Sequence, residues 1–278
     1  MTQVFNLMAL ASHLLFFLGY VWYTKQKGGG DMDHREYIRD VEGSPVAVLM
    51  IHGIAGTPAH FRDLIPVIPE NWTVHNILLD GHGKRVEDFG KTSMKKWKAQ
   101  ANAAVKELLS KHEKLLIVAH SMGTLFAIQA AIDHPDRIPA LFLLAAPMRP
   151  WVRFSTVQAS FRISGGRLRK DDTAAYNMIN GTSIQLDQGF WKYIPWMPRM
   201  AELLVEIRRV RKQLPRLTVP TQTYQSVVDE LVSDRACRVL EKNNCIQITR
   251  LYSSGHFAYG EEDIKLLQTE LVALIDTL

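Results

Sequence analysis

Residues 115–132 read LLIVAHSMGTLFAIQAAI, and this stretch decides the fold of the chain. The unbroken apolar run Leu115–Ala119 predicts a strand that is buried on both faces of a sheet. A helical pattern, Gly123–Ile132, begins only a few residues later, so the chain has to turn sharply at Ser121. A strand–turn–helix of this kind strains the backbone and projects the serine hydroxyl from the top of the sheet. Ser121 is therefore predicted to be a nucleophile.

The residues beside this serine fit such a turn. The segment reads Ala119-His120-Ser121-Met122-Gly123, with small residues two positions before and two positions after the serine. A large side chain at either position would collide with the neighbouring strand or helix, and alanine in place of the usual first glycine adds only one methyl group. The helix that begins at the serine directs its free N–H groups toward negative charge that develops there. The alternative is a serine that only caps a helix.

Strand and helix patterns alternate over most of the remaining chain. Strands are predicted at 46–51, 72–79, 140–145, 221–226 and 245–252, and helices at 94–112, 233–240 and 262–277. This alternation is typical of βαβ units and predicts an α/β fold with a mainly parallel central sheet and helices on both faces. Residues 148 to about 216 interrupt the pattern with a composition rich in Arg, Trp and Met, which predicts an inserted cap. The domain is therefore expected to cover residues 45–278.

A serine hydroxyl needs an adjacent base, and two histidines follow Ser121 in the chain, His134 and His256. His134 falls at the end of the predicted helix, roughly 20 Å from the serine by helical rise. His256 lies in the segment SSGHF, between the last predicted strand and the last helix. Catalytic groups of open α/β sheets gather at the carboxyl ends of strands, so His256 is the predicted base.

The carboxylate that orients the base is expected between the serine and the histidine, after a strand. Asp229 follows the predicted strand 221–226 and lies 27 residues before His256. It is the predicted acid. Two neighbours stay open as alternatives: Glu230, which is adjacent, and Asp234, which can begin the following helix.

A tetrahedral intermediate needs two backbone N–H donors. The residue after the nucleophile, Met122, supplies one, and the loop after the first buried strand, His52-Gly53-Ile54-Ala55-Gly56, supplies the other. Ile54 is the predicted donor of that loop. His52 is expected to brace the loop by hydrogen bonds without taking part in the chemistry.

Six motifs in order now mark a resemblance: HGIAG from His52, DGHGK from Asp80, AHSMG from Ala119, APM from Ala146, VVDELV from Val227 and SSGHF from Ser253. Together they resemble the bacterial carboxylesterase and monoacylglycerol lipase branch of the α/β-hydrolases, over residues from about 45 to 278. The resemblance implies the α/β-hydrolase fold, a Ser121–His256–Asp229 triad, Ile54 and Met122 as oxyanion donors, and a cap over an acyl pocket.

Within the predicted cap, aromatic and methionine side chains are candidates to line that pocket, above all Trp191, Trp196 and Met197. The alternative is that they pack the cap onto the domain. The expected substrate is a carboxylic ester, either an acylglycerol or a short-chain ester. No metal or organic cofactor is implied. The same triad also serves thioesterases and acyltransferases, and a binding protein that has lost catalysis would be expected to lack a triad member.

The N-terminal residues 1–24 contain no charged side chain, and Val4–Tyr23 is mostly apolar. Twenty helical residues span a hydrocarbon core about 30 Å thick, so a transmembrane or signal-anchor helix is predicted there. A cleaved signal peptide and a soluble helix remain alternatives. Residues 25–44, which include Gly28-Gly29-Gly30, are interpreted as a linker. Lys25 and Lys27 place the domain behind them on the cytoplasmic side by the positive-inside rule.

Composition and net charge limit the class of protein and the partners that are expected. Of 278 residues, 47% are hydrophobic and 22% charged, which is ordinary for a globular protein, and two cysteines are too few for a disulfide framework. The net charge is +5, and residues 148–216 are the most basic part, able to attract anionic lipid headgroups. No nucleic-acid-binding motif accompanies these basic residues, so nucleic acid is not an expected partner.

Overall fold

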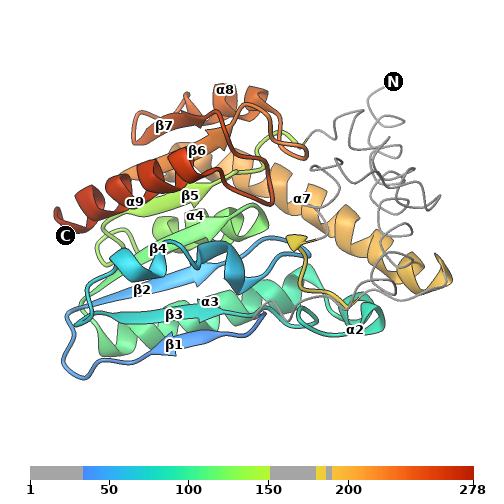
Figure 1. Ribbon diagram of the computed structural model, residues 1–278, viewed down its shortest axis with the longest axis horizontal. Helices are drawn as coiled ribbons and strands as arrows, with labels where there is room; N and C mark the ends of the chain where they lie inside the picture. Colours follow the sequence, from blue (N-terminus) through green and yellow to red (C-terminus); the bar gives the residue numbers. More distant parts are fainter. Residues whose placement is uncertain (1–33, 151–179, 186–189) are drawn as a thin grey trace.

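A seven-stranded sheet forms the centre of the protein, as a computed structural model shows for residues 34–150, 180–185 and 190–278 (Figure 1). The strand order is β1-β3-β2-β4-β5-β6-β7, and every neighbouring pair is parallel except β1 with β3. The strands are β1 (Tyr37–Arg39), β2 (Val46–Ile51), β3 (Thr73–Ile77), β4 (Lys114–His120), β5 (Leu141–Leu144), β6 (Thr221–Ser226) and β7 (Ile246–Leu251).

Helices connect the strands and cover the sheet. The α-helices are α2 (Val86–Lys91), α3 (Met94–Lys111), α4 (Met122–Asp133), α7 (Met197–Gln213), α8 (Cys237–Leu240) and α9 (Glu261–Ile275). Short 3-10 helices are η1 (Pro58–Phe61), η2 (Ile65–Val67), η3 (Phe190–Trp196), η4 (Leu214–Arg216) and η5 (Asp234–Ala236). Helices α3, α4 and α7 pack on one face of the sheet, and α9 with η1 packs on the other.

The alternation of side chains along β2 explains why both faces are covered. Leu49 and Ile51 lie in the core shared with α3 and α4, whereas Val48 and Met50 lie in the core shared with α9. Successive side chains of a strand point to opposite faces, so an unbroken apolar strand needs two apolar layers. Burial of both faces fixes the position of each strand in the sheet. It thereby also fixes the position of the loop that follows each strand.

The local sequence determines where helix α3 begins and which of its side chains are buried. Ser93 caps its N-terminus by accepting a hydrogen bond from the Lys96 N–H at 3.2 Å. Apolar side chains then recur at helical spacing and are buried: Met94, Trp97, Ala101, Val105 and Leu108. The Trp97 indole donates to the Asp80 carbonyl at 2.7 Å, which ties the helix to the loop after β3.

The predicted strands and long helices are confirmed, β2 and β6 with the predicted bounds. One part of the linker prediction is wrong, because Tyr37–Arg39 form β1 and pair antiparallel with β3. Three residues at a sheet edge, two of them exposed, leave little apolar signal in the sequence. Helix α7 also lies inside the predicted cap at 148–216, yet its Ile207 and Val210 are buried in the core beside α4.

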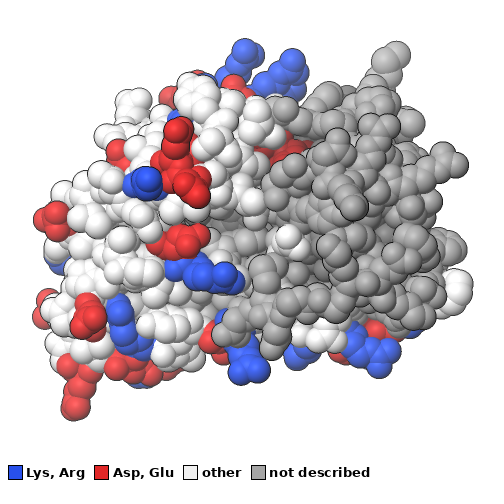
Figure 2. Space-filling view, viewed as in Figure 1, with Lys and Arg blue, Asp and Glu red and all other residues white. Residues whose placement is uncertain are grey.

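Two predictions fall on residues outside the described ranges. The transmembrane or anchor helix at residues 4–23 is one of them, and part of the predicted cap, residues 151–179 and 186–189, is the other. Among the residues that the structure describes, no helix has the length and apolar character to cross a membrane. Figure 2 shows acidic and basic side chains interspersed over the described part of one face, so no large area of one sign is present there.

Candidate active site

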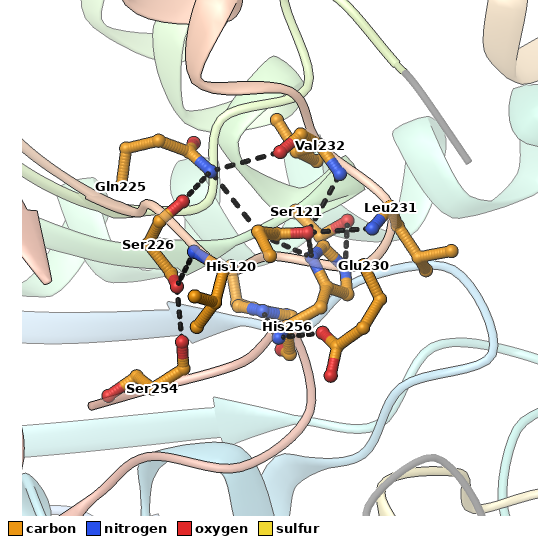
Figure 3. Close-up of polar contacts among 11 residues, drawn as sticks. His120, Ser121, Gln225, Ser226, Glu230, Leu231, Val232, Ser254 and His256 are labelled. Atoms are coloured by element: carbon orange, nitrogen blue, oxygen red, sulfur yellow. Dashed lines mark hydrogen bonds and ion pairs between the residues drawn. The ribbon is translucent and has the colours of Figure 1, made fainter. Parts of the chain in front are cut away.

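Three loops at one edge of the sheet bring the predicted site residues together (Figure 3). Ser121 follows β4, Asp229 follows β6 and His256 follows β7. Because these strands are parallel, their carboxyl ends meet at the same edge. The sheet thereby brings side chains that are 135 and 27 positions apart in sequence within hydrogen-bond distance.

Ser121 occupies a strained turn between β4 and α4. Its backbone angles are φ 51° and ψ −120°, a region that non-glycine residues rarely adopt. The Ser121 N–H donates to the Leu144 carbonyl at 2.9 Å, which holds the turn against β5. Gly123 is needed two positions later, because a Cβ there would lie 2.1 Å from the Ile51 carbonyl oxygen. The predicted strand–turn–helix and its requirement for a small residue at position 123 are confirmed.

The His256 ring lies between the serine and the aspartate. Its Nε2 lies 3.2 Å from the Ser121 Oγ, and its Nδ1 lies 2.9 Å from Oδ2 and 3.1 Å from Oδ1 of Asp229. A carboxylate only accepts hydrogen bonds, so Nδ1 carries the proton and the Nε2 lone pair faces the serine hydroxyl. All three side chains are buried.

The Asp229 carboxylate is held by the loop that carries it. Its Oδ1 accepts the backbone N–H groups of Leu231 at 2.8 Å and Val232 at 2.7 Å, and its Oδ2 accepts the Gln225 amide at 3.3 Å. These three donors fix the orientation of the carboxylate. Of the two sequence alternatives, Asp234 instead pairs with Arg250 at 3.0 Å. Asp229 is therefore the carboxylate that contacts the His256 ring.

Charge around His256 favours its protonated form. Burial is the largest single influence on the His256 pKa and lowers it. The negative charge of Asp229, its hydrogen bond to the ring and the charge of Glu230 all raise the pKa, and together they bring it above its ordinary value of 6.5. A buried imidazole with a raised pKa can take up a proton and hold it, which a general base has to do.

Other histidines surround the site in neutral form. His120 donates from Nε2 to the His256 carbonyl at 3.1 Å, and burial holds the His120 pKa well below 6.5. His52 accepts the Leu79 N–H on Nε2 at 3.0 Å and donates from Nδ1 to the Gly53 carbonyl at 2.8 Å. The predicted bracing role of His52 is thus confirmed, and burial likewise holds its pKa well below 6.5.

The loop after β2 approaches the serine closely. A Cβ on Gly53 would lie 2.7 Å from the Ser121 Cβ, so only glycine allows this approach. Ile54 follows Gly53, and Ala55 takes a positive φ of 52° as the loop turns back. Met122 is the first residue of α4, directly after the serine. The assignment of the Ile54 and Met122 N–H groups as oxyanion donors stays a prediction.

The predicted pocket residues of the cap have separate surroundings. Trp196 is buried against Phe89, with ring centroids 4.3 Å apart, and its indole donates to the Val86 carbonyl at 2.9 Å. It packs η3 onto α2, which agrees with the alternative that these aromatics pack the cap onto the domain. Its role as a pocket residue stays a prediction. Trp191 is 67% exposed and Met197, which begins α7, is half-buried. Their contact with a substrate stays a prediction.

Two contacts of His256 had no counterpart among the sequence predictions. His120 was only the variable position of the serine motif, and Glu230 was weighed as a rival acid. In the structure the Glu230 carboxylate accepts the His256 backbone N–H at 2.6 Å (Figure 3). The adjacent Gly255 is the one sequence signal that a close neighbour stands there.

The chain is similar to known proteins in sequence and in fold. Residues 46–263 match the family model described as alpha/beta hydrolase fold. The chain belongs to this family. Solved structures agree in fold: a metagenome-derived lipolytic enzyme superposes with a TM-score of 0.67 at 19% identity, over 89% of this chain and 99% of that chain. A monoacylglycerol lipase of Paleococcus ferrophilus gives 0.62 at 16%, over 87% and 99%.

Curated relatives match over a shorter stretch. A thermostable monoacylglycerol lipase of Bacillus sp. (strain H-257) is 32% identical over 96 residues, 34% of this chain and 38% of that protein. A pimeloyl-[acyl-carrier protein] methyl ester esterase of Neisseria meningitidis is 31% identical over 99 residues, 36% of each. The chain thus aligns with a little over a third of the length of these relatives.

Proposed function

We propose that this α/β-hydrolase cleaves carboxylic esters through an acyl-enzyme formed on Ser121. One observation carries the proposal, the continuous hydrogen-bonded chain from the Ser121 Oγ through the His256 ring to the Asp229 carboxylate. A serine on a strained turn, a base with a raised pKa and a buried carboxylate are the three parts that nucleophilic acyl transfer needs.

The chemistry proceeds in two steps. His256 Nε2 accepts the Ser121 proton as Oγ attacks the ester carbonyl, and the imidazolium that forms is stabilised by Asp229. The proton then passes to the departing alcohol, leaving an ester between the acyl group and Ser121. Water, deprotonated by His256, attacks this ester and releases the carboxylic acid, and Ser121 recovers its proton.

Negative charge on the carbonyl oxygen needs donors on the opposite side from the base. The Met122 N–H at the start of α4 and the Ile54 N–H in the loop after β2 are the proposed pair. Both lie in segments that approach Ser121, and the dipole of α4 adds a favourable field. Loss of one such donor would slow the reaction on the order of 10²–10³-fold.

The substrate class rests on relatives as well as on geometry. The two curated relatives are a monoacylglycerol lipase and a methyl ester esterase, so both act on carboxylic esters. Together with the triad, these names support an ester of a small alcohol or of glycerol as the substrate. Acyl chain length is left to experiment, because the cap residues 151–179 lie outside the described ranges.

A test follows from the nucleophile. Hydrolysis of p-nitrophenyl esters of increasing acyl length is measured for the wild type, for Ser121→Ala and for Ser110→Ala, an exposed serine on α3 as the matched control. Ser121→Ala is expected to lose activity on the order of 10⁵-fold or more. Ser110→Ala should keep it.

A fluorophosphonate probe gives a second readout of the same residue. Mass spectrometry of the labelled protein should place the adduct on Ser121 and nowhere else. Activity retained in Ser121→Ala, or an adduct on another residue, would overturn the proposed mechanism.

A further inference from the structure

The backbone of His256 is held on both sides. The Glu230 carboxylate Oε2 accepts its N–H at 2.6 Å, and the His120 imidazole donates to its carbonyl at 3.1 Å (Figure 3). The N–H contact is a charge-assisted hydrogen bond, which is about twice as strong as a neutral one. The loop that carries the base is therefore fixed at the peptide groups of the base itself.

Gly255 makes room for this carboxylate. A Cβ on Gly255 would lie 2.6 Å from Glu230 Oε1 and 2.9 Å from Oε2, closer than any side chain tolerates. Both carboxylate oxygens thus lie beside the Gly255 backbone, and Oε2 accepts the His256 N–H. The Gly255 N–H donates to the Ala258 carbonyl at 2.8 Å, which closes the loop behind it.

The charge of Glu230 acts on the His256 ring as well as on its backbone. Ionisable groups face His256 from several elements: Asp229 and Glu230 after β6, His120 at the end of β4 and His60 on η1. On the C-terminal side of His256, Tyr259 follows in the same loop and Asp263 lies in the first turn of α9. His60 and His120 are neutral near pH 7, since burial lowers the pKa of His60 to about 4 and that of His120 well below 6.5.

Tyr259 is neutral too, because burial raises the pKa of its hydroxyl. The Asp263 carboxylate accepts hydrogen bonds from the Ser254 hydroxyl at 2.6 Å and from the Ser253 N–H at 2.9 Å. Among these groups, the negative charge that raises the His256 pKa comes from Asp229 first and Glu230 after it. The base therefore has two carboxylates, one on its ring and one on its backbone.

We infer that Glu230 is a positioning residue for His256 and a second carboxylate that stabilises the imidazolium formed during proton transfer. This inference rests on the proposed function, because it takes His256 as the base. Asp229 holds the ring by Nδ1 and sets its tautomer, whereas Glu230 accepts the backbone N–H and adds a second negative charge. The two adjacent residues thus divide the work of orienting one imidazole.

Two substitutions of Glu230 distinguish its effect on the position of His256 from the effect of its negative charge. Glu230→Gln keeps an oxygen that can accept the His256 N–H but removes the charge, and Glu230→Ala removes both. Glu262→Gln, an exposed carboxylate at the start of α9, is the matched control for the loss of one charge near the same loop. The readout is kcat/KM for a p-nitrophenyl ester between about pH 5 and pH 9, where its acid limb reports the ionisation of the free enzyme's base.

For Glu230→Gln, the activity at high pH is expected to fall about threefold to tenfold, since the imidazolium is less stabilised. Its acid limb moves to lower pH, because His256 loses its proton more readily, so the ratio of variant to wild-type kcat/KM rises as the pH falls. Glu230→Ala shows the same movement with a deeper loss, on the order of 10²-fold, from misplacement of the base. Glu262→Gln is expected to leave the acid limb of the pH profile at its wild-type position.

The titration of His256 itself gives a readout that does not depend on activity. With ¹³C-labelled histidine, NMR follows the His256 ring in wild type and in Glu230→Gln, and the signal is assigned by its absence in His256→Ala. A midpoint that moves to lower pH in Glu230→Gln supports the inference, and an unmoved midpoint overturns it. Activity retained in Ser121→Ala would overturn the proposed function alone, since this titration still reports the effect of Glu230 on the ring.

Discussion

His256 and His120 are two buried imidazoles whose ring centroids lie 4.8 Å apart, yet they favour opposite charge states. The pKa of His256 is raised above 6.5, whereas burial holds that of His120 well below 6.5. Burial lowers both, so burial does not separate them. The difference lies in their partners: a carboxylate on the ring of His256, and a backbone carbonyl on the ring of His120.

This comparison shows what the site needs from each ring. Desolvation makes neutrality the default for an imidazole in this core, and only a carboxylate overrides it. The base has to become positive for a moment, and a second positive ring nearby would oppose that step. By staying neutral, His120 contributes a hydrogen bond to the base without a competing charge.

The largest effect is expected from Asp229→Asn, which removes the difference between the two rings by giving His256 an uncharged partner, as His120 has. The imidazole loses the charge that raises its pKa and the acceptor that fixes its tautomer. We expect kcat to fall on the order of 10⁴-fold, with the protein still folded. Steady-state kinetics with a circular dichroism spectrum checks this. A loss below about tenfold would mean that Glu230 or another group replaces Asp229.

A smaller effect is expected when the neutral partner is changed. His120→Leu leaves the His256 carbonyl without its donor, and an unsatisfied buried acceptor costs about 1–3 kcal/mol. We expect kcat/KM to fall about tenfold in His120→Leu, while His120→Gln, whose amide can donate from a similar position, stays near wild type.

The acid limb of the pH profile sharpens this test. Since His120 is uncharged above pH 6.5, its removal takes away no charge, and the limb stays where it is in the wild type. Movement of the limb in His120→Leu would show that His120 carries a proton in the working enzyme and would remove the contrast with His256.

The fold was accessible from the sequence because its decisive signals are local. The apolar run of β4, the sharp turn at Ser121 and the helix α4 are contiguous in the chain, and each follows from the spacing of apolar residues. Edge strand β1 was missed because its burial is slight. Helix α7 was missed because its apolar residues alternate with five Arg and Lys side chains, at positions 199, 208, 209, 211 and 212, which hid the buried face.

The triad was also accessible, since chain order and position after strands leave few candidates for Ser121, Asp229 and His256. The contacts of His120 and Glu230 were not, because both are hydrogen bonds to a backbone 136 and 26 positions away in sequence. No residue pattern encodes which backbone groups a side chain will meet. The contact of Trp196 with Phe89 was not accessible for a related reason, because the sequence pattern of an aromatic residue in a cap is the same whether it lines a pocket or packs on the domain.

The last prediction extends the comparison from one neutral histidine to several. Burial lowers the pKa of His60 and His82 to about 4 and holds those of His52 and His120 well below 6.5. As the pH falls from about 6.5 toward 4, the unfolded chain binds protons at these residues and the folded chain does not, so stability is lost. His256 has the opposite sign, since its raised pKa adds stability below 6.5 that is lost as the pH rises through its folded pKa.

The loss of stability from the four histidines with lowered pKa values is expected to exceed the gain from His256. Tm is therefore expected to drop by at least about 5 °C between pH 7.5 and pH 5, measured by scanning calorimetry. His82→Phe tests the cause, because it keeps a ring beside Phe89 and Trp97 and removes one titrating group. Its drop should be smaller than that of the wild type by about 1–2 °C. An equal drop in both proteins would show that protonation of His82 does not contribute to the acid sensitivity. Burial raises the pKa of the Asp263 carboxyl, but hydrogen bonds from Ser254 and Ser253 bring it below 3.8, so its contribution to stability is lost only at lower pH. Since that carboxylate titrates below this pH window, the histidines are the groups expected to set the slope.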